Sequence, residues 1–243
     1  MEDDMRIDYK KKQIKQLELY FRCLSSVCID SVLAYYYVPY EFLKFERYLG
    51  NRVLKKGLRL WDIKDAETLK TRIRWLLEDG NRDDYKALHA ELSALPEQAR
   101  QNWMEASKDH PEYARMSMVH TFLPQLPAGE IAAFGGGWAI FLSRVGLAYG
   151  YLTKEEAWAI KLEAAGYVQQ HYGSWEEYLI AFMAASRFWK PEEQFANVVY
   201  IMTRGQTLLG MGTFASRKAP WDIPLEPGGE RAAYRKGSAS LDA

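Results

Sequence analysis

The sequence predicts an all-α fold, a single-domain irregular helical bundle, on three observations. Apolar residues recur at three- and four-residue spacing along most of the chain, which is the periodicity of a helix face. Thr153 with Glu156, and Ser174 with Glu177, match the capping-box pattern that begins a helix. No stretch of the chain is convincing as a strand.

Composition and charge narrow the class of protein. The 243 residues are 48% hydrophobic and 26% charged, globular proportions that exclude wholesale disorder. Lys plus Arg and Asp plus Glu are both 32, so the basic surplus typical of a dedicated nucleic-acid binder is missing. The two cysteines exclude a disulfide scaffold, and the acidic start lacks the apolar run of a secretory signal. We therefore expect a cytoplasmic protein that binds neither nucleic acid nor membrane.

The first 50 residues are predicted to be an N-terminal helical extension. One helix is expected over residues 6–37, ending before Pro39 because the residue before a proline avoids the α region. An aromatic group lies across the end of this helix, and two interpretations remain open: packing of the helix onto the body, or a partner-binding surface. The group comprises Tyr35, Tyr36, Tyr37, Tyr40, Phe42, Phe45 and Tyr48.

Residues 51–227 form the predicted helical core domain, and residues 228–243 a mobile tail rich in small and charged residues. Asp65 is a suitable cap for a helix that ends at Gly80, and a second helix is expected over residues 82–92. Prolines are favoured in the first helical turn, so further helices are predicted to begin at Pro96, Pro111 and Pro191.

An uncharged helix over residues 130–150 is predicted to be the central, most buried element. Its uncharged run is shorter than the about 20 residues that cross a bilayer, and Arg144 follows that run. Membrane association through residues 131–152 is a weaker alternative. Gly135, Gly136 and Gly137 each weaken a helix by about 1 kcal/mol relative to alanine. We therefore expect either a close approach by a neighbouring backbone or a break in the helix at this point.

Two capped helices follow, the first ending near His171 and the second near Trp189. The short turn around Gly173 favours an antiparallel arrangement of such helices. We expect this pair, over residues 153–189, to be the centre of the bundle.

The sequence carries no recognisable catalytic or metal-binding motif. No two of the four histidines stand three or four residues apart, and the cysteines lack the short spacing of a thiolate site. There is no GxSxG elbow, and the glycine run lacks the spacing of a phosphate-binding loop. We therefore assign no catalytic residue and expect neither a metal nor a cofactor.

Tryptophans and arginines near the predicted helix ends are the remaining candidates for a site. An indole and a guanidinium together suit a groove that binds a ligand or a peptide. The other interpretation is a structural aromatic core. The candidates are Trp61, Trp75, Arg82, Arg144, Trp175, Arg187 and Trp221.

Two blocks of the sequence resemble the bacterial family called domain of unknown function 1266. The first block spans residues 61–85, with Asn81 where the family usually has histidine. Its matching residues are Trp61, Ile63, Trp75, Leu76, Gly80 and Arg82. The second block spans residues 142–189, and its matching residues are Arg144, Gly150, Tyr151, Glu156, Ala157, Ser174, Trp175, Arg187 and Trp189.

The resemblance extends to Pro220 and Trp221, which are similar to the Pro-Trp ending of the family. There is one departure, because a Trp-Asp pair that members often show before the second block is replaced here by Phe134, Gly135 and Trp138. The resemblance implies a helical fold and a bacterial origin. It implies no activity.

Our leading hypothesis is a non-enzymatic protein–protein interaction module with an unidentified protein partner. It rests on the missing catalytic and metal-binding motifs and on the aromatic group near residue 40. One version is an immunity or antagonist protein that occludes a toxin. The alternative is an enzyme or small-ligand binder that uses a groove lined by tryptophan and arginine.

Overall fold

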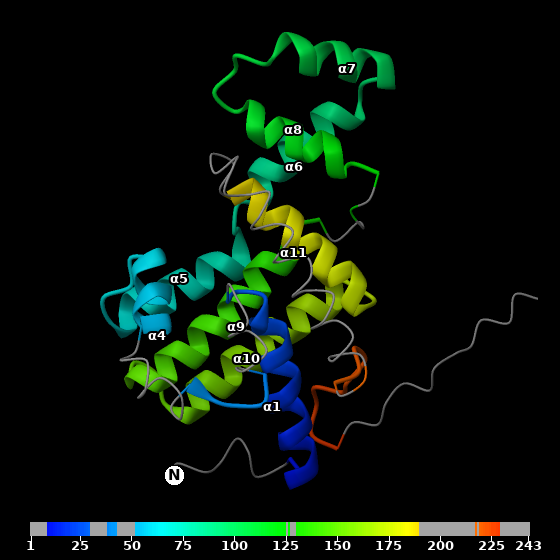
Figure 1. Cartoon of the computed structure of the whole chain (residues 1–243). Coiled ribbons are helices and arrows are strands. Elements are labelled where there is room, and N and C mark those ends of the chain that lie inside the picture. Colours follow the sequence, from blue (N-terminus) through cyan, green and yellow to red (C-terminus); the bar gives the residue numbers. More distant parts are fainter. Residues whose placement is uncertain are drawn as a thin grey trace, which may run out of the picture.

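The computed structural model describes residues 9–29, 38–42, 52–124, 126, 130–189, 217 and 219–228, and these contain helices and turns but no strand (Figure 1). The all-α prediction is thus confirmed. The helices are α1 (Lys11–Ser26), α4 (Arg52–Leu60), α5 (Ala66–Glu78), α6 (Arg82–Ser93), α7 (Glu97–Ala106), α8 (Tyr113–Phe122), α9 (Ala132–Tyr149), α10 (Lys154–His171) and α11 (Trp175–Trp189).

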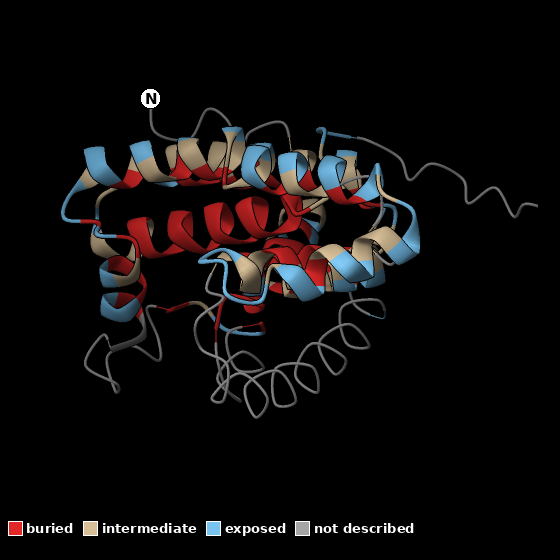
Figure 2. Ribbon diagram, turned by 90° about the horizontal axis from the view of Figure 1, so that it is seen from above, coloured by how far each residue is buried: buried red, intermediate tan, exposed pale blue. Residues whose placement is uncertain are grey.

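Helix α9 is the centre of the molecule. Every residue from Ala132 to Gly146 is buried, and α1, α4, α5, α10 and α11 all pack against this helix. Figure 2 shows it red along most of its length, between helices whose outward faces are pale blue. A helix that is apolar all round is stable in water only when it is covered on all sides. The prediction of a central buried helix is therefore confirmed.

The three consecutive glycines of α9 let its neighbours approach closely. The helix continues unbroken through them, so the expected break does not occur. A carbon atom added at each glycine would collide with a different neighbouring helix: at Gly135 with the backbone oxygen of Leu76 at 2.0 Å, at Gly136 with Cγ2 of Val168 at 2.2 Å, and at Gly137 with the hydroxyl of Tyr178 at 2.6 Å. The expected close approach of a backbone is confirmed for α5, whereas α10 and α11 approach with side chains, those of Val168 and Tyr178.

The helix pairing differs from the expected one. Helices α10 and α11 each pack extensively against α9 but only slightly against each other, and the most extensive contact is between α9 and α10. The reason is that α9 is apolar on every face and has no side chains at its glycines. Both neighbours therefore pack mainly against α9.

The capping box predicted at Thr153 is present in full, and the one predicted at Ser174 is present in part. The Thr153 side chain accepts a hydrogen bond from the backbone N–H of Glu156, and the Glu156 side chain accepts one from the N–H of Thr153. At the start of α11, the Ser174 hydroxyl accepts from the N–H of Glu177 at 3.2 Å. The Glu177 carboxylate accepts from the N–H of Gly173, one residue before the predicted partner.

Helix α1 ends at Ser26, so the prediction of a helix reaching Tyr37 is wrong. The hydroxyls of Ser25 and Ser26 donate to the carbonyls of Phe21 and Cys23, at 2.9 and 2.6 Å. Serine hydroxyls that bond to the preceding turn weaken a helix and favour its end. The helix predicted from Pro191 and the tail beyond residue 228 lie outside the described residues.

Helices α6, α7 and α8 form a lobe, here called the α6–α8 lobe, at the top of Figure 1. Helix α8 packs against α6, α7 and α11, whereas α7 packs mainly against α8. The lobe is thus joined to the α9 core largely through α8 and α11. None of the described helices is long and apolar enough to span a membrane.

Candidate functional site

Trp61 and Trp75 belong to one aromatic cluster beside the N-terminal half of α9. Their ring centroids lie 6.2 Å apart, and Trp61 stacks on Trp189 at 4.8 Å. The guanidinium of Arg72 covers both rings, at 5.6 Å from the Trp61 centroid and 5.2 Å from that of Trp75. Trp61 is buried. The two residues are therefore together, in a packed interior position.

Trp175 and Trp221 are also together and fix the C-terminal segment to the bundle. Their ring centroids are 5.1 Å apart in an edge-to-face arrangement. The Trp175 indole donates to the carbonyl of Ala219, and the Trp221 indole donates to that of Tyr172, both at 2.8 Å. Buried indole N–H groups need such acceptors. The Pro-Trp ending thus closes onto the start of α11.

Arg82 connects the first turn of α6 to the end of α10. Its guanidinium donates to the Tyr167 hydroxyl at 2.9 Å and to Nε2 of His171 at 3.2 Å. Because a guanidinium only donates, we assign Nε2 of His171 as the acceptor. Its Nδ1–H then donates to the carbonyl of Tyr167 at 2.7 Å. A carboxylate oxygen of Glu130 lies 3.7 Å from Nε of Arg82, so the cluster ties two helices to the turn before α9.

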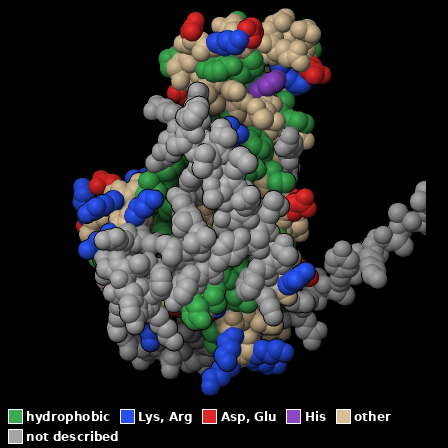
Figure 3. Space-filling model, viewed as in Figure 1, with side chains coloured by type: hydrophobic (Ala, Val, Ile, Leu, Met, Phe, Trp, Pro, Cys, Tyr) green, Lys and Arg blue, Asp and Glu red, His purple; other side chains and the backbone are tan. Residues whose placement is uncertain are grey.

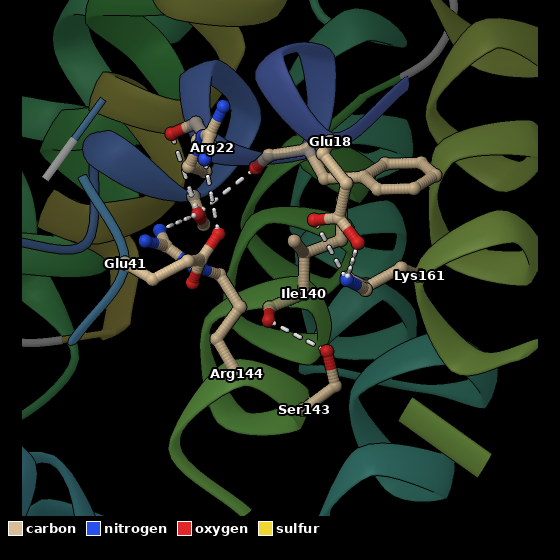
Figure 4. Close-up of polar contacts among 9 residues, drawn as sticks. Glu18, Arg22, Glu41, Ile140, Ser143, Arg144 and Lys161 are labelled. Carbon is tan, nitrogen blue, oxygen red and sulfur yellow. Dashed lines mark hydrogen bonds and ion pairs between the residues drawn. The ribbon is translucent and has the colours of Figure 1, made fainter. Parts of the chain in front are cut away.

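Arg144 is buried inside a network of charged groups (Figure 4), with 4% of its surface exposed. Its guanidinium donates to the Ser25 hydroxyl at 2.7 Å and lies 3.6 Å from a carboxylate oxygen of Glu41. The same group sits 4.2 Å from the centroid of the Phe42 ring. Arg22 completes the pairing with Glu41, at 3.3 Å. Arg144 thereby joins α9 to α1 and to the short segment 38–42.

Lys161 on α10 extends this buried network. Its ammonium group donates to both carboxylate oxygens of Glu18, at 2.8 and 3.0 Å, and lies over the rings of Phe21 and Trp158. Burial lowers the pKa of Lys161, and the Glu18 carboxylate opposes that shift. Burial raises the pKa of Glu41, but Arg144 and Arg22 together outweigh it and hold this pKa below its usual range. These charges are paired across helices, which is what a buried charge requires.

The predicted groove residues therefore occupy several different environments. Arg187 lies apart from the others, with its guanidinium 6.0 Å from the centroid of the Phe122 ring. Among the contacts of the described residues, only Trp61 with Trp75 and Trp175 with Trp221 are brought together.

The predicted partner surface is described in part. Tyr40 is 47% exposed. Phe42 is buried, with its ring centroid 5.6 Å from that of Phe141 on α9. The remaining members lie outside the described residues: Tyr35, Tyr36, Tyr37, Phe45 and Tyr48.

A groove that the sequence did not reveal lies within the α6–α8 lobe, with a volume of about 520 Å³. Figure 3 shows hydrophobic, histidine and charged side chains together on this lobe, at the top of the view. The groove is lined by Asp84, Ala87, Leu88 and Glu91 of α6, by Trp103 of α7, by Arg115 and Met116 of α8, and by Ser107, His110 and Glu112 between α7 and α8. The α6 residues share one helix face, since their spacing is three and four.

The charges of the groove are unevenly matched. Three carboxylates, those of Asp84, Glu91 and Glu112, face the single guanidinium of Arg115. Arg115 lies 3.1 Å from Glu112 and 3.8 Å from Asp84. Glu91 makes no ion pair or hydrogen bond with any described residue. The half-buried Trp103 ring has no aromatic or cationic partner among them either.

The described part of the chain is an all-α protein with a groove in its α6–α8 lobe. A family model described as protein of unknown function (DUF1266) matches residues 59–223, and the chain belongs to this family. The resemblance of the two sequence blocks is confirmed. Neither the curated proteins nor the solved structures contain a match to the chain. Within the described part of the chain, no three His, Cys, Asp or Glu side chains are placed to hold a metal ion.

Proposed function

We propose that this chain is a non-enzymatic protein–protein interaction module, and that a partner protein docks a basic segment in the groove of the α6–α8 lobe. The observation that carries the proposal is the groove itself. It combines apolar lining from Leu88, Trp103 and Met116 with an excess of carboxylates. Its volume lies within the range of about 300–1,000 Å³ that is usual for binding sites.

Charge complementarity supports a basic partner. Carboxylates in a concave surface steer positively charged groups toward it and penalise acidic ones. The exposed positions of Asp84, Glu91 and Glu112 keep this attraction available to a partner in solution. Binding is therefore expected to weaken as salt concentration rises.

The polar clusters elsewhere support a binding role over a catalytic one. Arg82, Arg144 and Lys161 each join two helices through hydrogen bonds, so each has a structural role. The alternative function needs the tryptophans and arginines in one groove. They lie instead in separate environments.

A specific form of the proposal is a bacterial, cytoplasmic immunity or antagonist protein that covers a basic surface of a toxin. A reducing compartment is compatible with the two buried cysteines, Cys23 and Cys28, which form no disulfide with each other. Occlusion of a basic surface is what an acidic groove on a projecting lobe is suited to do.

The test is a binding measurement with a co-purified partner. A partner that co-purifies at stoichiometric amounts with the intact chain is titrated calorimetrically against wild type, Glu91→Lys and Glu163→Lys. Glu163 is an exposed residue of α10 and does not line the groove, so it is the matched charge control. We expect about 10-fold or more weaker binding for Glu91→Lys and a change within about two-fold for Glu163→Lys. Equal binding by both variants, or no stoichiometric partner, contradicts the proposal.

A further inference from the structure

We infer that the partner's anchor in this groove is an arginine side chain, held by the indole of Trp103 and the carboxylate of Glu91, and that Arg115 weakens this binding through its own pairing with Glu112 and Asp84. The inference rests on the proposed function, whose site it shares. It adds the chemical identity of the partner's anchor residue and gives Arg115 a role in setting how tightly that residue binds.

Trp103 and Glu91 supply complementary halves of a cation site. Both line the groove, from α7 and α6. Indole has the strongest attraction for cations among the aromatic side chains. The Glu91 carboxylate is free of any ion pair with the described residues, so no resident cation must be displaced from it.

Arginine fits this pair better than lysine does. Its planar guanidinium can stack on an indole and still present two N–H groups to a carboxylate. Its aliphatic stem suits the apolar lining made by Leu88 and Met116.

The groove already holds one arginine in a similar way. The Arg115 guanidinium lies 5.2 Å from the centroid of the Phe188 ring and pairs with Glu112 and Asp84. This is the same combination of an aromatic ring and carboxylates that we infer for the partner's arginine. Because Arg115 pairs with two of the three carboxylates, its single positive charge offsets part of the negative charge of the groove and lowers the attraction for a second cation. Removing its charge should therefore tighten binding.

The experiment uses N-acetyl-arginine methylamide as the probe, and the neutral N-acetyl-citrulline methylamide as its control. Both are titrated into the full chain labelled with ¹⁵N, and the indole N–H signals are followed by NMR. The Trp103 signal is the one missing from the spectrum of Trp103→Phe. We expect the arginine probe to shift this signal selectively, with a dissociation constant in the millimolar range, and the citrulline probe to leave it in place.

Three variants test the roles of the charges. Glu91→Gln should weaken binding of the arginine probe about five-fold, because it removes the charge that pairs with the probe. Arg115→Gln should tighten binding about two- to five-fold, because it removes the positive charge that pairs with Glu112 and Asp84. Glu163→Gln, outside the groove, should change neither. Equal shifts with arginine and citrulline, no shift of Trp103, or an Arg115→Gln variant that binds more weakly would overturn the inference.

Its failure is distinguishable from failure of the proposed function. If Glu91→Lys loses the co-purified partner but the arginine probe does not shift Trp103, the interaction module stands and the arginine anchor is wrong. If the probe shifts Trp103 but no partner depends on the groove, the site binds a small cationic molecule. That outcome rejects the partner's arginine as its occupant.

Discussion

At the residue scale, the charges inside this protein are explained by the groups that face them. Lys161 is 3% exposed and meets Glu18 at hydrogen-bond distance. A buried pair of this kind contributes little net stability, but removing one member leaves the other charge uncompensated. The network around Arg144 therefore specifies where α1 and segment 38–42 lie against α9.

Glu41 gives this network a dependence on pH. Its pKa is lower in the folded protein than in the unfolded chain, so it stabilises the fold at pH values above its unfolded pKa. That stabilisation is lost as the pH falls through the folded pKa, starting below about pH 5. We expect Glu41→Gln to lower the free energy of unfolding at pH 7 by about 1 kcal/mol, because the pair is only partly buried. The variant should also show a smaller loss of stability between pH 7 and 3.

Urea unfolding at several pH values measures this effect. Glu163→Gln is the control, since Glu163 is exposed and away from the network. If Glu41→Gln and wild type lose stability in parallel on acidification, Glu41 is not the group responsible.

Alanine substitutions of two glycines on neighbouring helices distinguish the effect of close packing on stability from the effect of helix propensity. Alanine at Gly135 would place a carbon 2.0 Å from a backbone oxygen of α5, whereas at Gly166 of α10 the nearest neighbour is Leu225 at 3.6 Å. Overpacking a core costs about 1–3 kcal/mol. Alanine in an open helical position gains up to about 1 kcal/mol over glycine. We therefore expect Gly135→Ala to lower the melting temperature and Gly166→Ala to leave it unchanged or raise it.

The two melting temperatures give the result directly. Equal tolerance of alanine at both positions would mean that α5 does not approach α9 as closely as described.

At the element scale, the capping boxes are the local signals that worked best. In the Thr153 box, the threonine side chain accepts a hydrogen bond from the N–H of Glu156, and the Glu156 carboxylate accepts one from the N–H of Thr153. Both bonds involve only residues close in sequence. The end of α1 was missed because apolar spacing continues beyond Ser26, while serine hydroxyls bond to the preceding turn. The choice between these local effects depends on burial, which the sequence does not show.

Substitution of the α10 cap tests the energetic weight of one helix start. Thr153→Ala removes the acceptor for the Glu156 N–H, and loss of such a cap costs about 1 kcal/mol. Lys154→Ala, at the next position and exposed, is the matched control and should change stability by less than about 0.5 kcal/mol. Chemical denaturation of both variants provides the comparison. A Thr153→Ala protein as stable as Lys154→Ala would show that packing alone fixes this helix start.

At the scale of the whole molecule, the central helix was predictable and the groove was not. The uncharged stretch with three glycines indicates a helix that is covered on all sides, and this can be predicted without knowing which helices cover it. The groove needs one face of α6, Trp103 of α7 and Arg115 of α8 to converge, and the sequence does not show how these consecutive helices turn toward one another. Asp84 alone is an ordinary acidic residue in a first helical turn. Only the arrangement of three helices makes it part of a site.

The same arrangement predicts which helices unfold locally before the whole molecule unfolds. Helix α9 is buried from Ala132 to Gly146, whereas α7 buries only Met104 fully and packs mainly against α8. Elements with few buried apolar contacts open locally at a lower free energy than the global unfolding. We expect native-state hydrogen exchange to protect α9 amides up to the global free energy of unfolding. After correction for intrinsic rates, α7 amides should exchange about 100-fold faster or more.

Low urea concentrations distinguish this local opening from global unfolding. Exchange of α9 should accelerate with urea along the global slope, and exchange of α7 should hardly respond, because a local opening exposes little new surface. If α7 opens locally in this way, the groove can change shape without disturbing α9. Equal protection and equal urea dependence in α7 and α9 would instead show that lobe and core unfold as one cooperative unit, with a rigid groove.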